Sequence, residues 1–388
     1  MTDIAGEDSL RPNPLELAAG RMFGLHSGAP KIADADGSGR APLAALEAAI
    51  LPYLERGPCF VAFSGGRDSS TVLAAATRAA RREGLPRPVP VTLRVRDAPR
   101  AEESEWQERV IRHLGVEDWE RCEVGEDMDR VGAFSVSVLR RHGVLYPPNT
   151  FLQIPLLEAA RGGCLLAGLG GDELFAGWRW RNRADALARR RRPRARDPLG
   201  MAFAASPTVV RRWRETRRYR LAGLVWLRPE AARAASRLVA TARAEQPRAW
   251  PRWVDWVARR RSVCAAQWSL SLLASDADTV LVHPLLDPGF VAAFARAGGR
   301  LGFGDRTAGM RAMFGDLLPD DVLCRPTKAE YGEVFWGSGT REFATRWSGA
   351  GVDSELVDPD ALRREWLKPR PHEDSAMLLH AAWLAEQD

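Results

Sequence analysis

Residues 64–70, SGGRDSS, combine groups that bind phosphate with one group that repels it. Gly65 and Gly66 allow a ligand to approach the backbone closely, and consecutive N–H groups there can form an anion-binding nest. The loop also supplies hydroxyl donors at the start of a predicted helix, where the helix dipole favours negative charge: Ser64, Ser69 and Ser70. Asp68 fits this setting when Mg²⁺ lies between its carboxylate and the phosphate oxygens. The loop therefore predicts a magnesium–pyrophosphate site, with an ordinary N-capped turn as the alternative.

A second acidic turn follows another apolar run, in residues 166–180, LAGLGGDELFAGWRW. Glycines precede Asp172 and Glu173, which open a predicted helix. Because the carboxyl ends of parallel strands meet at one edge of a sheet, Asp68 and Asp172 are predicted to bind the same metal ion or one ion each. The alternative is that these acids only complement a helix dipole.

The segments around both turns alternate between apolar strands and helices of 10–15 residues. The predicted strands are 59–63, 90–95, 121–124 and 164–170, and the predicted helices are 42–50, 70–84, 102–115, 128–141 and 150–163. Pro52 is expected to end or kink the first helix. Such alternation predicts parallel βαβ units and an α/β fold with a doubly wound sheet.

The chain is predicted to divide into four parts. Residues 1–41 form an irregular N-terminal arm, 42–185 an α/β nucleotide-binding domain, 186–198 an arginine-rich linker and 199–388 a mostly helical region that completes the site. Strand signals stop after about residue 185, which places the boundary in the linker. No internal repeat is evident.

Composition narrows the class of protein. The 388 residues are 45% hydrophobic and 27% charged, without an apolar run of the length that crosses a membrane, and the polar N-terminus does not resemble a secretion signal. The five cysteines are scattered and form no CxxC pair, which favours reduced thiols in a cytoplasm and disfavours zinc. The net charge is +6, and we interpret the arginine clusters at 189–196 and 209–220 as solvated surface, with nucleic-acid binding as the alternative.

Four segments, in conserved order, resemble one known family over roughly residues 42–340. SGGRDSS resembles the SGGxDS signature of the PP-loop ATP pyrophosphatases, and GLGGDELFAG resembles the GEGxDExFxG motif of the asparagine synthetase C-terminal domain. Two later segments, 278–295 and 317–337, resemble further stretches of that domain. The first motif indicates only the superfamily, and the second indicates the asparagine synthetase branch.

The resemblance implies ATP and Mg²⁺ as cofactors and an AMP-forming reaction. A substrate carboxylate attacks the α-phosphate of ATP, pyrophosphate leaves, and an amine attacks the acyl-adenylate to form an amide. The implied metal ligands are Asp68 and Asp172, and the implied catalytic residues are Asp172 and Lys328, whose charge would stabilise phosphate and tetrahedral oxygens. The implied ATP and pyrophosphate contacts are Ser64, Gly65, Gly66, Asp68, Ser69, Ser70, Gly168 and the strand residues Val91, Thr92 and Leu93.

Two departures from the family bear on the substrates. Asparagine synthetases begin with a glutaminase domain whose nucleophile is an N-terminal cysteine, whereas Met1-Thr2 and about 40 residues precede the matching region here. We therefore expect no glutaminase activity, so that the amine is free ammonia, comes from a partner or belongs to a substrate. Leu169 stands where the family has a glutamate, and leucine cannot pair with an amino group, which argues against free aspartate as substrate.

A third departure is the spacing Arg325-Pro-Thr-Lys328, one residue longer than the family pattern. This segment is similar to the lasso-peptide macrolactam synthetases, in which amine and carboxylate belong to one peptide. The β-lactam synthetases are another relative, in which a Tyr–Glu pair acts as base; Tyr331 with Glu330 or Glu333 would be the pair here. The candidate substrate contacts are Leu169, Glu173, His283 and Tyr331, although His283 also fits a packed or capping role.

The sequence therefore predicts an amide ligase of peptide or natural-product biosynthesis, acting on a carboxylate other than free aspartate. A partner protein presenting the substrate is compatible with this prediction, and membrane and nucleic-acid partners are not expected. Two alternatives remain open. One is a tRNA-modifying PP-loop enzyme that uses Arg189–Arg196 to contact phosphates, and the other is a non-catalytic partner subunit, which Leu169 would suit.

Overall fold

A five-stranded parallel sheet forms the centre of the computed structural model, which describes residues 8–31, 39–96, 103–175, 178–192, 194–195, 197–218, 223–325 and 332–387. The strands are β1 (Cys59–Ala62), β2 (Val89–Val95), β3 (Glu120–Val124), β4 (Cys164–Leu166) and β5 (Val280–Val282). Their order across the sheet is β3-β2-β1-β4-β5, and every neighbouring pair is parallel. The predicted α/β fold is confirmed.

Alternation along β1 explains why both faces of the sheet are covered. Val61 and the following Phe63 pack into one apolar cluster, whereas Phe60 and Ala62 pack against the other. The first face carries α3 (Pro42–Leu54), α4 (Arg67–Glu83), α5 (Ser104–Leu114) and α15 (Pro288–Ala297). The second carries α6 (Ala133–His142), α7 (Ile154–Ala159) and α14 (Arg261–Asp276). Covered faces are what parallel sheets require, since their strands are apolar on both sides.

The first helix does not end where the sequence suggested. α3 runs through Pro52 to Leu54, without the predicted stop after residue 50. Pro52 lies in the last turn, so the single hydrogen bond that its nitrogen cannot donate is lost only near the helix end. Two other predicted helices also differ. A 3-10 turn (Glu126–Met128) precedes α6, and another (Thr150–Gln153) precedes α7.

Within the described ranges after β4, the remaining elements are helices and 3-10 turns, with one exception. The helices between β4 and α14 are α8 (Gly171–Phe175), α9 (Arg181–Leu187), α10 (Asp197–Ala205), α11 (Thr208–Arg218), α12 (Pro229–Glu245) and α13 (Trp250–Ala258). After α15 follow α16 (Arg306–Phe314), α17 (Asp320–Leu323), α18 (Gly332–Phe335), α19 (Ser338–Arg346), α20 (Pro359–Trp366) and α21 (Ala376–Ala385). Short 3-10 turns span Pro284–Leu286 and Glu373–Ser375. The exception is β5, which the sequence did not predict and which pairs with β4 at the sheet edge.

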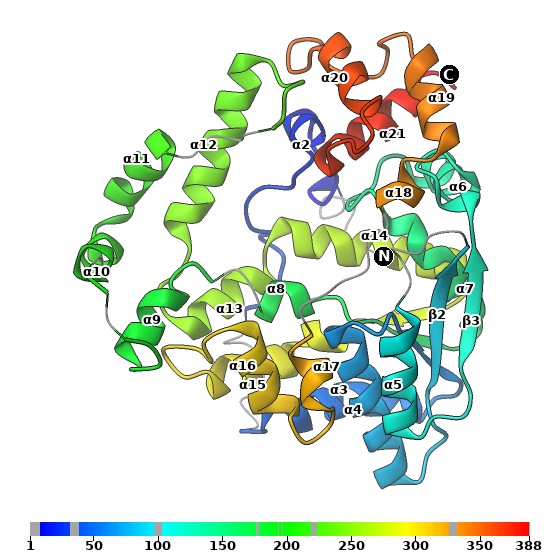
Figure 1. The fold of residues 1–388 in the computed structure, drawn as a ribbon, viewed down its shortest axis with the longest axis vertical. Helices are drawn as coiled ribbons and strands as arrows, with labels where there is room; N and C mark the ends of the chain where they lie inside the picture. Colours follow the sequence, from blue (N-terminus) through cyan, green and yellow to red (C-terminus); the bar gives the residue numbers. More distant parts are fainter. Residues whose placement is uncertain are drawn as a thin grey trace.

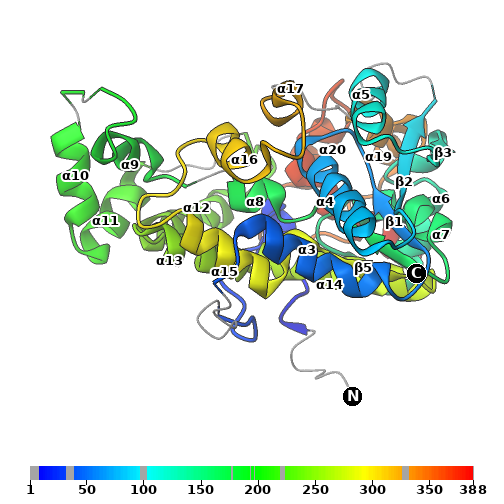
Figure 2. The ribbon, with the colours of Figure 1, turned by 90° about the horizontal axis from the view of Figure 1, so that it is seen from below.

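Two groups of helices extend beyond the sheet. Helices α9–α12 lie to one side of it in both views, and α18–α21 lie together at the top of Figure 1 (Figures 1 and 2). α16 lies between the α9–α12 group and the sheet (Figure 2). The apolar clusters include residues from both sides of the predicted linker 186–198, and the four-part division of the chain stays a prediction.

The N-terminal segment is more ordered than the sequence suggested. Residues 14–19 form the helix α2 (Pro14–Ala19), which begins with a capping box between Asn13 and Glu16. Trp226 donates its indole N–H to the carbonyl of Ala18 over 2.8 Å, and Glu16 pairs with Arg261 at 2.5 Å. The prediction of a wholly irregular arm was therefore wrong for this stretch.

No helix in the described ranges combines the length and the apolar character needed to cross a membrane.

Candidate active site

The order of the strands creates a crevice at the carboxyl end of β1. From β1 the chain winds outward through β2 to β3, and then returns to place β4 on the opposite side of β1. The loops after β1 and β4 therefore leave neighbouring strands in opposite directions, and ligands of open α/β sheets bind at such a point. These two loops lead into α4 and α8, whose first turns carry Asp68 and Asp172.

The loop after β1 has the geometry of an anion-binding turn. Gly65 has a φ of +79°, which only glycine adopts without strain. Gly66 is the N-cap of α4 and provides no side chain to cap the first-turn N–H groups. The hydroxyls of Ser64 and Ser69 lie 3.1 Å apart, and Ser64 Oγ accepts the N–H of Gly66 at 3.2 Å. Phosphate oxygens can replace these weak internal contacts.

Glycine also lets the second loop lie directly against Asp68. A Cβ at Gly171 would stand 2.1 Å from Asp68 Cγ, so no other residue fits there without a shift. At Gly168 it would stand 3.0 Å from the backbone nitrogen of Ser69. The two predicted acidic turns are thus packed together, which brings Asp68 and Asp172 to one place.

Arg306, the first residue of α16, bridges the two acids. Its Nη2 donates to both carboxylate oxygens of Asp68, at 2.7 and 2.6 Å, and its Nη1 donates to Asp172. Burial alone would lower the pKa of Arg306, but the charges and hydrogen bonds of the two acids raise it above its ordinary value. A single cation therefore joins two carboxylates from the helices that follow β1 and β4.

Around this ion triad lies a cavity of about 580 Å³, here called the strand-end cavity. Predicted site residues that line it are Ser64, Gly66, Asp68, Ser69, Val91, Leu93, Gly168, Leu169, Asp172 and His283. Residues that were not predicted also line it, among them Arg67, Arg306, Arg325, Leu152, Leu156 and Leu270.

The family model for asparagine synthase matches residues 45–385. The chain belongs to the asparagine synthase family. In general terms it is therefore an ATP-dependent ligase that forms amide bonds, and the resemblance seen in its motifs is confirmed at this level. A search of curated proteins found no significant match. The similarity to lasso-peptide and β-lactam synthetases stays a prediction.

Four site residues predicted for this asparagine synthase homologue do not line the strand-end cavity. Gly65 and Ser70 are both buried, and Ser70 has no exposed surface. Thr92 donates its hydroxyl to the carbonyl of Phe63 at 2.6 Å and accepts the indole N–H of Trp119 at 2.9 Å. Its side chain is therefore engaged within the sheet, and the adenine contact expected of its backbone stays a prediction. Glu173 is half-buried and lies outside the lining.

Other predicted residues fall on segments that the structure does not describe. Lys328, Glu330 and Tyr331 are outside the described residues, as is the side chain of Glu333. The roles assigned to them stay predictions.

His283 contributes an unusual polar group to the wall of the strand-end cavity. Both of its ring nitrogens are buried and have no hydrogen-bond partner in the described part of the chain. Burial lowers the pKa of His283 to about 4, so that the imidazole is neutral at physiological pH. A neutral imidazole offers one donor and one acceptor, which suits a polar group of a ligand.

Arg306 and Arg325 are two of the cavity residues that were not predicted from the sequence. Arg325 is buried, donates to the carbonyl of Gly65 at 2.9 Å and forms an ion pair with Glu103. Its guanidinium also lies 4.9 Å from the ring centre of Trp106. For Arg325 the family-like motif at 317–337 was a usable signal, whereas nothing in the sequence connects Arg306 to Asp68.

The donor set fits the Mg²⁺ and ATP that the family implies. Among the described residues, no group of three or more His, Cys, Asp or Glu side chains is placed to hold a metal ion. Mg²⁺ bound with a nucleotide needs only one or two carboxylates, because phosphate oxygens and water complete its coordination. Asp68 and Asp172, which already converge on one cation, meet that requirement.

Proposed function

We propose that this chain adenylates a carboxylate other than that of free aspartate and joins it to an amine, with release of AMP and pyrophosphate. We further propose that both groups belong to one peptide, so that the product is a macrolactam of natural-product biosynthesis. The observation that carries the proposal is the convergence of Asp68 and Asp172 on one cation beside the uncapped start of α4.

The leaving pyrophosphate would lie against the loop at 64–66 and the first turn of α4. Backbone N–H groups, the hydroxyls of Ser64 and Ser69, and the dipole of a helix of 17 residues all favour an anion there. Asp68 and Asp172 would hold Mg²⁺, which when bound offsets the charge of the phosphate oxygens. Arg67 and Arg306 line the same cavity and add positive charge near the phosphates.

The proposed reaction has two balanced steps. In the first, a carboxylate oxygen bonds to the α-phosphorus of ATP as the bond from that phosphorus to the bridging oxygen breaks, and pyrophosphate leaves. In the second, the amine nitrogen bonds to the acyl carbon, AMP leaves with the carboxylate oxygen, and the amine loses a proton. Positive charge fixed near the α-phosphate lowers both barriers because negative charge develops there.

Lys328 is the proposed source of that fixed charge. Arg325 lines the strand-end cavity and lies three positions before Lys328 in the sequence. Lys328 itself lies outside the described residues, and its place at the cavity is part of the proposal.

The acyl side of the cavity favours an apolar substrate. Leu169 lines it together with Leu152, Leu156 and Leu270, and no acidic side chain stands at position 169 to bind an amino group. Burying the carboxylate and ammonium groups of free aspartate against leucines would cost on the order of a few kcal/mol for each unpaired group. His283, neutral and unpartnered, would hydrogen-bond a peptide amide in the same wall.

The proposed amine source is the substrate itself. Glutamine hydrolysis needs an activated nucleophile such as a thiolate. None of the five cysteines is among the described residues that line the cavity, and burial raises the pKa of Cys122 and of Cys264.

The test is exchange of labelled pyrophosphate into ATP, measured with free aspartate and with linear peptides that carry an apolar segment beside an acidic side chain. We expect exchange and AMP formation with a peptide, no exchange with aspartate, and loss of amide formation in Lys328→Met. ADP as product, or exchange with aspartate alone, would contradict the proposal. ATP binding without turnover on any carboxylate would favour a non-catalytic subunit.

A further inference from the structure

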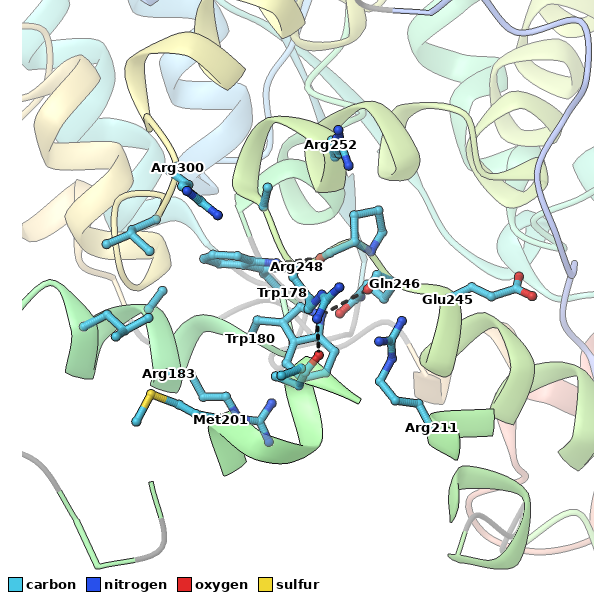
Figure 3. Close-up of a pocket in the computed structure, with 17 residues that line it drawn as sticks. Trp178, Trp180, Arg183, Met201, Arg211, Glu245, Gln246, Arg248, Arg252 and Arg300 are labelled. Carbon is cyan, nitrogen blue, oxygen red and sulfur yellow. Dashed lines mark hydrogen bonds between the residues drawn. The ribbon is translucent and has the colours of Figure 1, made fainter. Parts of the chain in front are cut away.

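A second cavity, of about 710 Å³, lies in the helical part of the chain and shares no lining residue with the strand-end cavity. We call it the tryptophan–arginine cavity (Figure 3). Helices α9, α10 and α11, the junction of α12 and α13, and the turn at residues 300–301 surround it. Nothing in the proposed ligase reaction uses this cavity.

Two nearly buried tryptophans give the cavity a rigid apolar wall. Trp178 donates its indole N–H to the carbonyl of Pro247 at 3.3 Å, and Trp180 donates to that of Gln246 at 3.1 Å. Both indole donors are thus engaged, and what the rings offer to the cavity is apolar surface. Arg183 stacks on Trp180, with its guanidinium carbon 4.6 Å from the ring centre.

Positive charge in this cavity greatly exceeds negative charge. The arginines that line it are Arg183, Arg211, Arg248, Arg252 and Arg300, and Glu245 is the acid among the described lining residues. Figure 3 shows the Glu245 side chain extending away from the two tryptophans, whereas Arg248 lies beside Trp178.

The hydrogen bonds of these arginines leave their charge uncompensated. Arg211 is buried and donates to the carbonyls of Ala244 and Ser206, at 2.9 and 2.7 Å, and Arg248 donates to the carbonyl of Ala204 at 2.6 Å. These acceptors carry no net charge. Burial lowers the pKa of Arg211, and the like charges of Arg248 and Arg179 lower it further.

Nearby acids are already paired with other arginines. Glu215 binds Arg179 at 2.7 Å and Arg243 at 3.1 Å, and Asp197 binds Arg191 at 2.6 Å. For Arg183, Arg252 and Arg300, no ion pair to an acid is present within the described ranges. The cavity therefore presents a wall of aromatic surface with an unbalanced group of guanidinium forks.

We propose that the tryptophan–arginine cavity binds an organic anion that has an aromatic or apolar body. The body lies against Trp178 and Trp180, and a carboxylate or phosphate group accepts hydrogen bonds from Arg248, Arg252 and Arg300. Guanidinium groups bind both anions through paired N–H donors, and the volume of the cavity is in the usual range for small-molecule sites. This site goes beyond the ligase function and stands whether or not that function holds.

The test uses three probes with the same ring system: 2-naphthoate, 2-naphthyl phosphate and the neutral 2-naphthalenemethanol, each titrated into the full chain by calorimetry. We expect at least one anion to bind about tenfold or more tightly than the neutral probe. The stronger of the two anions tells whether the site takes carboxylates or phosphates. In the variant Arg252→Ala/Arg300→Ala, that anion should lose about tenfold or more in affinity.

The exposed positions of Arg252 and Arg300 make this variant safer for folding than a change of the buried tryptophans. Arg237→Ala, an exposed arginine of α12 outside the lining, is the matched control and should bind like the wild type. Arg306→Ala reports binding in the strand-end cavity and should also leave the probe affinity unchanged.

Four results would overturn the proposal: binding of none of the probes, equal binding of the neutral probe, an equal loss in Arg237→Ala, or a loss in Arg306→Ala without one in the double variant.

Discussion

Arginines line both cavities of this chain, but acids offset their charge in one cavity and leave most of it unbalanced in the other. In the strand-end cavity Arg306 lies between Asp68 and Asp172, so one positive and two negative charges leave the ion triad with a formal charge of −1, and any cation must compete with a guanidinium. The described lining of the tryptophan–arginine cavity contains five arginines and one carboxylate. Arginine is thus a counter-ion that a cation must displace in the strand-end cavity, whereas in the other cavity it attracts anions.

The largest expected effect comes from breaking the acidic pair. Asp172→Ala removes one of two carboxylates that fit Mg²⁺ and leaves Arg306 with Asp68 alone. We expect Mg²⁺-dependent binding of an ATP analogue, with a carbon bridge between the α- and β-phosphates, to weaken about 100-fold or more. Calorimetry with and without Mg²⁺ measures this.

Asp316→Ala, an exposed acid near the end of α16, is the control for that experiment and should bind like the wild type. Unchanged binding in Asp172→Ala would mean that the acids hold Arg306 for structural reasons only.

The next largest effect concerns the stability of the protein in acid. Of the two cavities, only the strand-end cavity has a histidine among its described lining residues. Burial lowers the pKa of His283 to about 4, and burial together with the charge of Arg130 lowers that of the core residue His380 to about 3. The unfolded chain binds protons at these sites below about pH 6.5, so stability is complete above that pH and falls as the pH drops. Between pH 7 and pH 5 the loss is about 2 kcal/mol for each histidine.

Denaturant midpoints at the two pH values test this prediction. His283→Gln and His380→Gln should each flatten the dependence on pH, whatever they do to stability at pH 7. A slope equal to that of the wild type in both variants would show that neither imidazole is kept neutral by the fold.

Replacing the bridging arginine should have a smaller effect. Arg306→Gln leaves Asp68 and Asp172 close together without a cation, which we expect to cost about 1–2 kcal/mol of stability. Mg²⁺ alone should then restore much of the loss and raise the melting temperature more than in the wild type, since it no longer competes with the guanidinium. The control Arg311→Gln changes an arginine of the same helix that pairs with Asp320. A Mg²⁺ response identical to that of the wild type would contradict the competition.

The smallest expected effect concerns the tryptophan–arginine cavity. Arginine does not titrate below about pH 12, so the affinity for the naphthyl anion should stay flat between about pH 6 and pH 9 for the carboxylate probe. It should fall severalfold between about 50 and 500 mM salt, because Arg252 and Arg300 are exposed and salt screens them. A strong dependence on pH in this range would point to a titrating group other than the lining arginines.

Local patterns were enough to predict the parts of the fold that surround the first acidic turn. The apolar run 59–63 and the Ala-rich pattern after it place β1 and α4 correctly, because a buried strand and an amphipathic helix differ in period, although α4 begins at Arg67, before the predicted start at residue 70. The three-residue strand β5 was missed since Val280–Val282 is too short to show alternation, and only pairing with β4 makes it a strand. α2 was missed although Asn13 and Glu16 form a recognisable capping box.

The candidate site was predictable only for residues that lie just after a strand and whose side chains suggest a metal or phosphate contact. Asp68 and Asp172 each follow a strand, and parallel strands bring such residues to one edge. Arg306 reaches them across more than 130 positions of sequence, and no local pattern encodes that contact. Arg325 was visible in a motif, but its bond to Gly65 depends on tertiary structure.

The order β3-β2-β1-β4-β5 also fixes when the site can come into being during synthesis of the chain. Asp68 leaves the ribosome early, but its acidic neighbour is more than 100 residues behind it and reaches it only after β4 has paired with β1. For as long as α16 has not emerged, the two carboxylates would stand side by side with no internal cation. Arg306 ends that interval, so the ion triad closes only when about four-fifths of the chain has been made. A partly synthesised chain that already contains the SGGRDSS loop therefore still lacks the arginine that later joins the two acids.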